Sequence, residues 1–155
     1  AGDQSGTDAQ DIRTANFRYD AANNQLVYTL DLTSLATTTP NMSWTIQSRF
    51  GTTDVFVTAA VTETATTYEY GTITTLQTGT PNQESLGAAD SGQISGDRIT
   101  IRVSLDKINA AVGHNVLGET STLTQAKAQV LIGTSASGGL LLNSDSASGQ
   151  DFKVQ

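Results

Sequence analysis

The segment Gln25-Leu-Val-Tyr-Thr-Leu-Asp-Leu32 decides the fold class of this 155-residue chain. Its leucines and its tyrosine occupy every second position, and this period of two predicts a β-strand with one buried face. Residues 12–19 form another strand-like run. The intervening Asp20-Ala-Ala-Asn-Asn24 is typical of a hairpin turn. The chain therefore begins with an antiparallel β-hairpin.

Strand-like alternation recurs along the rest of the chain. Further runs cover residues 44–50, 55–61, 66–76, 99–105, 125–132 and 151–154. The Gly-, Pro- and Asn-containing stretch 77–93 predicts a long loop, and Asp106 is expected to cap a single helical turn over 106–110. No apolar stripe of helical period exceeds two turns. We therefore expect one all-β domain over 1–155, a jelly-roll-like antiparallel β-sandwich of about 8–10 strands.

The composition narrows the functional classes. Fifteen acidic against eight basic residues give a net charge of −7, which repels nucleic acids and anionic membranes. The chain has no cysteine, so disulfides, thiolate catalysis and Cys-ligated metals are excluded. No apolar run approaches the roughly 18 residues of a membrane span. The start at Ala1 and the Thr-, Ser- and Asn-rich, Lys-poor composition are typical of exported proteins, so we expect an extracellular location.

Catalytic motifs are sparse. The only histidine, His114, has no G-x-S-x-G nucleophile motif to accompany it, so a Ser-His-acid hydrolase is disfavoured. Glycoside hydrolysis requires two facing carboxyl groups, and nothing in the sequence pairs the glutamates. We expect a non-catalytic protein. A polysaccharide-active enzyme that uses Glu63 or Glu69 remains the lesser alternative.

Aspartates spaced by Gly and Ser occur near both ends of the chain. Such a pattern suits calcium, which takes six to eight oxygen ligands. Because chain termini of a compact domain often lie close together, the aspartates are predicted to form one structural calcium site in place of disulfides. The predicted ligands are Asp3, Asp8, Asp11, Asp145 and Asp151.

Aromatic residues offer a second candidate site. Trp44, Tyr68 and Tyr70 lie on strand-like runs, and exposed aromatic rings on a sheet can stack on the apolar faces of sugars. We consider them candidate ligand-binding residues. The alternative is that they fill the core of the sandwich.

Several short segments resemble a known group of domains. They are Ala1-Gly-Asp-Gln4, Asp11-Ile12, the strand 25–32, Trp44-Thr-Ile-Gln-Ser-Arg-Phe50, Tyr68-Glu-Tyr-Gly71, Ile99-Thr-Ile-Arg-Val103 and Gly149-Gln-Asp-Phe-Lys-Val154. Together they resemble the β-sandwich accessory domains of secreted bacterial proteases and glycosidases, which are similar to family 9 carbohydrate-binding modules and DOMON-like domains. The resemblance implies a structural calcium near the N-terminus, with Asp3 and Asp11 among its ligands.

These observations predict a non-catalytic, calcium-stabilised accessory module of an exported protein that binds polysaccharide or a cell-surface glycan. The structural alternative is a subunit of an extracellular filament or surface layer, which would self-associate by adding a strand to the sheet edge of a neighbouring copy.

Overall fold

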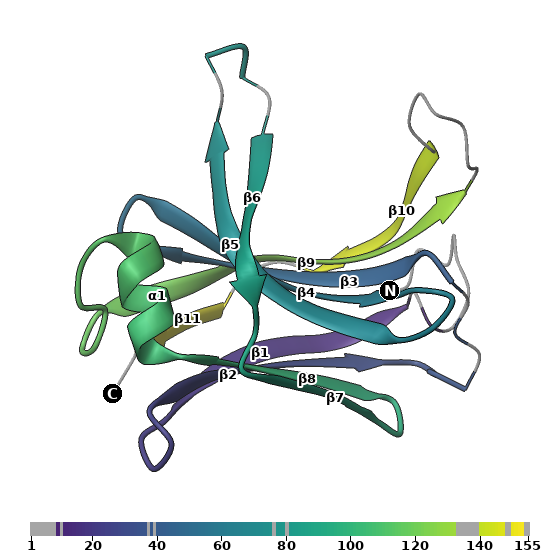
Figure 1. The fold of residues 1–155 in the computed structure, drawn as a ribbon, viewed down its shortest axis with the longest axis horizontal. Coiled ribbons are helices and arrows are strands. Elements are labelled where there is room, and N and C mark those ends of the chain that lie inside the picture. Colours follow the sequence, from purple (N-terminus) through teal and green to yellow (C-terminus); the bar gives the residue numbers. More distant parts are fainter. Residues whose placement is uncertain are drawn as a thin grey trace.

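The computed structural model describes residues 9, 11–36, 38, 40–75, 77–79, 81–132, 140–147 and 150–153, and from residue 129 onward only their backbone. The described elements form two antiparallel β-sheets that pack face to face, with one short helix (Figure 1). The all-β sandwich predicted from the sequence is confirmed. None of the helices in the described ranges is long and apolar enough to cross a membrane.

Sheet A contains four of the described strands. Their order is β1 (Ile12–Asp20), β2 (Gln25–Leu32), β8 (Arg98–Ser104) and β7 (Ser91–Ser95). The predicted first hairpin is the β1–β2 pair, in which Asp20 lies opposite Gln25. Strand β2 is central in this sheet because it pairs with both β1 and β8.

Sheet B contains the other seven described strands. Their order is β10 (Leu140–Ala147), β9 (Thr120–Ile132), β3 (Met42–Phe50), β4 (Thr53–Val61), β5 (Thr66–Thr75) and β6 (Pro81–Ala88), and β11 (Gln150–Lys153) also pairs with β9. Strands β3 and β4, which contain the strand-like runs 44–50 and 55–61, form another antiparallel hairpin.

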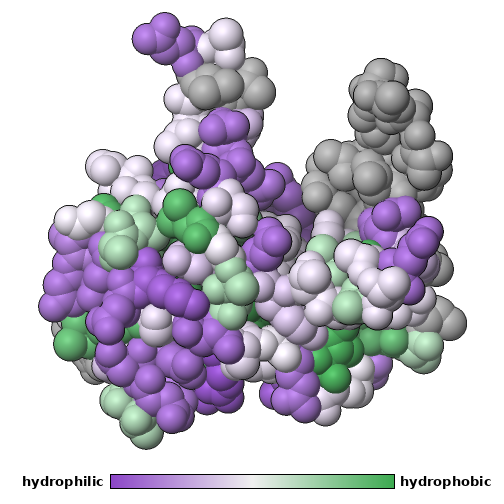
Figure 2. All heavy atoms as spheres, viewed as in Figure 1, coloured by the Kyte–Doolittle hydropathy of each residue, from purple (hydrophilic) through white to green (hydrophobic). Residues whose placement is uncertain are grey.

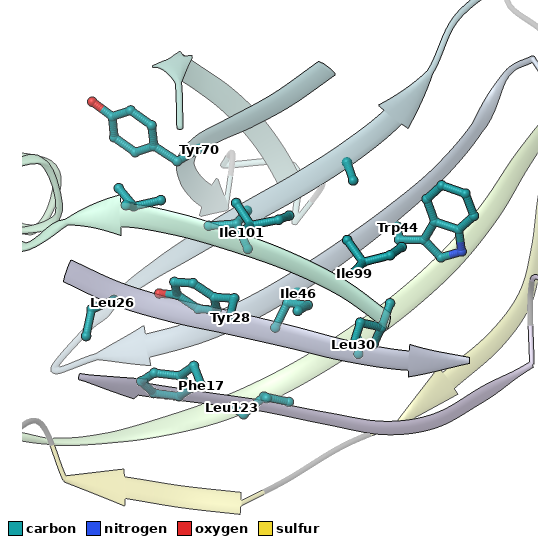
Figure 3. Close-up of a cluster of buried hydrophobic side chains, with 14 of the residues drawn as sticks. Phe17, Leu26, Tyr28, Leu30, Trp44, Ile46, Tyr70, Ile99, Ile101 and Leu123 are labelled. Atoms are coloured by element: carbon teal, nitrogen blue, oxygen red, sulfur yellow. The ribbon is translucent and has the colours of Figure 1, made fainter. Parts of the chain in front are cut away.

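The core lies between the two sheets, where the alternating apolar residues of both face inward (Figure 3). Phe17 of β1 stacks on Tyr28 of β2 with ring centroids 5.3 Å apart, and it forms a T-shaped pair with Phe50 of β3. The Tyr28 hydroxyl lies 3.0 Å from Ser48 Oγ, so this buried polar group keeps a hydrogen bond. Burial raises the pKa of Tyr28 well above its usual range.

Helix α1 (Leu105–Val112) connects sheet A to sheet B, between β8 and β9. Ser104 is its N-cap and accepts a hydrogen bond from Lys107 N, and Gly113 ends it with φ of 89°. The sequence-based expectation of one turn capped by Asp106 is corrected here. The helix begins at the apolar Leu105, and its cap is the preceding residue, Ser104, which ends strand β8.

The hairpin β5–β6 projects from the body of the sandwich (Figure 1). All eight residues of β6 are exposed, and the projecting part of the hairpin has hydrophilic to neutral colours in Figure 2. Residues 77–93, expected to form a loop, therefore contain β6 and the start of β7. The alternation rule missed β6 because a strand with neither face buried carries no apolar period.

Candidate functional site

The predicted calcium ligands occupy different parts of the molecule. Asp3 and Asp8 lie outside the described residues. Asp11 directly precedes β1, and its Oδ2 accepts a 2.6 Å hydrogen bond from Thr33 Oγ1. The backbone carbonyl of Asp11 accepts a second bond from Thr33 N at 2.9 Å. Asp11 therefore fastens the start of β1 to the residue that follows β2.

The two C-terminal aspartates lie on different strands, β10 and β11, which pair with distant parts of β9. Asp145 pairs with Ala128 of β9, whereas Asp151 pairs with Thr122, six residues earlier in the same strand. At 3.2–3.4 Å per residue this separation is about 20 Å, so one cation cannot bind both. The prediction that all five aspartates form one calcium site is therefore wrong, because Asp145 and Asp151 cannot both belong to it. Calcium binding by a subset that includes Asp11 stays a prediction.

Trp44 is a core residue. Its side chain is 1% exposed, and its Nε1 donates a 2.8 Å hydrogen bond to the backbone carbonyl of Ala9. A ring with both faces packed cannot stack on a sugar. The structure thus favours the core alternative for Trp44 over the ligand-binding one. The indole N–H also fixes the chain just before β1.

The two tyrosines of β5 point toward sheet A and not toward solvent. A side chain on Gly92 of β7 would overlap the half-buried ring of Tyr68. Tyr70 is 8% exposed, and the Lys107 ammonium lies 5.6 Å from its ring centroid. Tyr68 and Tyr70 therefore join the sheets to each other and to α1. Trp44 and Tyr70 are buried, so they do not form an exposed aromatic platform; ligand binding by the half-buried Tyr68 stays a prediction.

The structure instead shows an open polar groove on sheet A. It lies at the end of the sheet where β1 starts and β7 turns into β8. Figure 1 shows the β7–β8 turn on the right. One cross-strand row spans all four strands there: Thr14, Asp31, Arg98 and Ser95. The groove is lined by Arg13, Thr14, Asp31, Leu32, Ser95, Asp97 and Arg98.

A β-bulge in β1 shapes one wall of this groove. Ile12 pairs with Leu32 and Thr14 pairs with Asp31, so Arg13 is the extra residue. In a regular strand, consecutive side chains point to opposite faces. Arg13 and Thr14 both line the groove, and the bulge makes this possible because it re-aims a side chain.

Asp31 is the best-connected side chain in the groove. Arg98 donates to it through Nε at 2.6 Å and Nη2 at 3.0 Å, and Thr14 Oγ1 donates at 2.8 Å. The hydrogen bond from Arg98 holds the pKa of Asp31 below its usual value of 3.8, with Thr14 and the charge of Arg13 acting in the same direction. Partial desolvation opposes them. Asp31 is therefore a stable carboxylate that orients Arg98 and Thr14.

The β7–β8 turn forms the opposite wall. Asp97 Oδ1 accepts a 2.9 Å hydrogen bond from Leu35 N, and its carbonyl accepts one from Leu32 N at 2.9 Å. These two bonds hold the turn against the segment that leaves β2. The Asp97 carboxylate is consequently held by a backbone N–H of the segment that follows β2.

The remaining candidates from the sequence lie on different elements. His114 Nε2 lies 2.8 Å from Glu119 Oε1 in an exposed pair, and Glu69 accepts a 3.1 Å hydrogen bond from Ser85 Oγ. Glu63 is exposed in the loop between β4 and β5. Within the part of the chain that the structure describes, no three His, Cys, Asp or Glu residues are grouped to hold a metal ion.

Comparisons with protein-family models, curated proteins and solved structures found no match for this chain. The resemblance to family 9 carbohydrate-binding modules and DOMON-like domains therefore stays a prediction. The groove is interpreted from its own geometry.

Sequence reasoning missed the groove, although one signal was present. The inward residues of β1 are Ile12, Ala15, Phe17 and Tyr19. Their spacing is three residues and then two, and this break in a period of two indicates a bulge between the first pair. It does not indicate which strands meet the bulge, so the partners Asp31, Asp97 and Arg98 could not be found in this way.

Proposed function

We propose that this domain is a non-catalytic binding module of an exported protein, and that it attaches its parent protein to polysaccharide or a cell-surface glycan through the groove on sheet A. The observation that carries the proposal is the groove itself, an open, polar surface whose central side chains are held in place by cross-strand bonds. Such preorganisation lowers the entropic cost of binding.

The groove chemistry supports a polyhydroxylated ligand. Guanidinium groups offer several N–H donors and carboxylates offer only acceptors. The Thr14 hydroxyl, whose proton goes to Asp31, offers an acceptor, and the Ser95 hydroxyl offers both. Sugar hydroxyl groups can pair with all of these. The net charge of −7 acts against nucleic acid as the alternative polyanionic polymer.

The state of Asp31 supports binding over catalysis. A glycosidase requires one carboxyl group that stays protonated to act as general acid. Asp31 has its pKa lowered by the Arg98 hydrogen bond, so it does not hold a proton at neutral pH. Asp97 alone cannot supply both carboxyl roles.

The binding proposal is tested with the isolated domain and a panel of soluble polysaccharides in affinity gel electrophoresis. We expect retardation by at least one glycan, and amide chemical-shift changes confined to Thr14, Asp31, Ser95 and Asp97. The absence of retardation across the panel would contradict the proposal. Release of reducing ends from any panel member would contradict its non-catalytic part.

Structural calcium is a second part of the proposal, supported by the aspartates near the start of β1. A ligand of the folded state alone stabilises it by RT ln(1 + [Ca²⁺]/Kd). We expect the melting temperature to rise in CaCl2 and to fall in EGTA, with NaCl of equal ionic strength as control. An Asp11→Asn variant should show a smaller rise. Melting curves that coincide in CaCl2 and EGTA would rule this part out.

One observation favours the filament alternative as a second candidate function. Strand β6 ends the described order of sheet B, and all eight of its residues are exposed. An exposed edge strand can pair with another chain. Light scattering at high protein concentration tests this, and a strict monomer with and without calcium would exclude it.

A further inference from the structure

We infer that the groove selects a neutral sugar and that Arg13 and Asp97 bind its hydroxyl groups from opposite walls. The inference rests on the proposed glycan-binding function and names the ligand class of the same site. It follows from which charges of the groove are already paired and which are free.

The floor of the groove is internally satisfied. The Asp31 carboxylate accepts hydrogen bonds from Arg98 Nε, from Arg98 Nη2 and from the Thr14 hydroxyl, so its negative charge is compensated within the protein. Arg98 has a 58% exposed side chain, but its position is set by Asp31. A ligand therefore meets an ion pair there with little net charge to attract an ionic group.

Arg13 provides a positive charge that forms no ion pair with a described residue, although it acts electrostatically on Asp31. Its side chain is exposed, and it has no hydrogen bond or ion pair with any other described residue. The bulge that places Arg13 on the same side as Thr14 interrupts the β1–β2 ladder. The exposed Arg13 side chain is therefore placed where a ligand in the groove can reach it.

Asp97 provides the free negative charge. Its Oδ1 is engaged by Leu35 N, but in the described parts of the chain Asp97 forms no ion pair. It belongs to the β7–β8 turn and its carbonyl accepts from Leu32 N of β2, whereas Arg13 belongs to β1, so strand β2 lies between them. The two free charges of opposite sign thus line opposite sides of one groove.

This arrangement discriminates between classes of sugar. A neutral hydroxyl group can accept from Arg13 and donate to Asp97, because it has both a proton and lone pairs. A uronate would pair with Arg13 but would be repelled by Asp97. An amino sugar would pair with Asp97 but would be repelled by Arg13. Two arginines and two aspartates line the groove, so no excess charge outweighs these local effects.

The test compares Arg13→Ala and Asp97→Asn with the wild type for binding to a neutral β-glucan and galactomannan, to polygalacturonate and to chitosan. Asp97→Asn keeps an oxygen that can accept from Leu35 N. Arg18→Ala is the matched control, because Arg18 is an exposed arginine of the same strand outside the groove lining. Melting curves of all variants establish that they fold.

The wild type should bind a neutral polysaccharide, and Arg13→Ala and Asp97→Asn should each weaken this binding about tenfold or more, as loss of a charge-assisted hydrogen bond does. Arg18→Ala should bind within about twofold of the wild type. Binding of polygalacturonate or chitosan alone would overturn the inference but keep the proposed function, and so would unchanged binding by Arg13→Ala. If no polysaccharide binds, the proposed function fails and the inference fails with it.

Discussion

Two arginine–aspartate pairs in this molecule are almost identical in geometry. In sheet A, Arg98 Nε lies 2.6 Å from Asp31 Oδ1, and in sheet B, Arg49 Nε lies 2.8 Å from Asp54 Oδ1. Both pairs are bidentate, and the arginine side chains are 58% and 55% exposed. Exposed pairs of this kind contribute only about 0.2–1 kcal/mol to stability.

The difference lies in what the pairs connect. Arg49 and Asp54 are five residues apart and flank the turn of the β3–β4 hairpin. Arg98 and Asp31 are 67 residues apart and join β8 to β2 in the middle of sheet A. Around the second pair lie Thr14, the Arg13 bulge and Asp97. The same chemical pair thus fastens a hairpin in one place and positions a groove in the other, and its neighbours decide which.

The sharpest way to break this comparison is to remove each carboxylate and measure glycan binding. Asp31→Ala frees Arg98 and Thr14, so we expect the affinity for a groove ligand to fall about tenfold or more. Asp54→Ala, the matched variant in sheet B, should change affinity less than about twofold. Isothermal titration calorimetry measures both. Equal losses in the two variants would mean that the groove pair has no special role.

Stability should show a smaller effect that the two pairs share. Asp31→Asn and Asp54→Asn should each lower the free energy of unfolding by about 0.2–1 kcal/mol, because both pairs are exposed. Urea denaturation monitored by tryptophan fluorescence is suitable, since Trp44 is buried in the core. A loss above about 2 kcal/mol for either variant would show that its pair is not an ordinary surface ion pair.

The smallest effect is the pH dependence of the Asp31 contribution. Its folded-state pKa is lowered by the Arg98 hydrogen bond, so its stabilisation is fully present above the unfolded pKa of about 3.8. It is lost as the pH falls through the lowered folded pKa. The difference in melting temperature between wild type and Asp31→Asn should therefore be constant near neutral pH and shrink below about 3.8. A difference that grows on acidification would contradict the assigned direction.

The fold was largely predictable because its strands have one buried face. The alternation in 25–32 led to β2, and the turn residues at 20–24 led to the first hairpin. Strand β6 could not be found in the same way, because all of its residues are exposed and none has to be apolar. It is held by backbone hydrogen bonds to β5, and these do not depend on the type of side chain. The cap of α1 was misplaced by two residues, from Ser104 to Asp106, since both are good capping residues.

The candidate site was less predictable. Trp44 and Tyr70 were candidates for binding by residue type, but the packing of the two sheets buries both. Arg13 and Asp97 had no distinguishing local sequence, and they line one groove only because β1 and the β7–β8 turn meet at the same end of sheet A.

The sequence by itself determined a β-sandwich without cysteine chemistry and with an acidic surface. Strand periodicity is a property of short segments, and net charge is a sum over residues, so neither depends on which strands pair. Only the tertiary structure decided which charges are paired and which are free. Pairing depends on register between strands that are distant in the sequence: it matched Arg98 to Asp31 across 67 residues and left Arg13 in the bulge. A bulge of one residue re-aims a side chain, and the chain's composition does not record where that side chain then points.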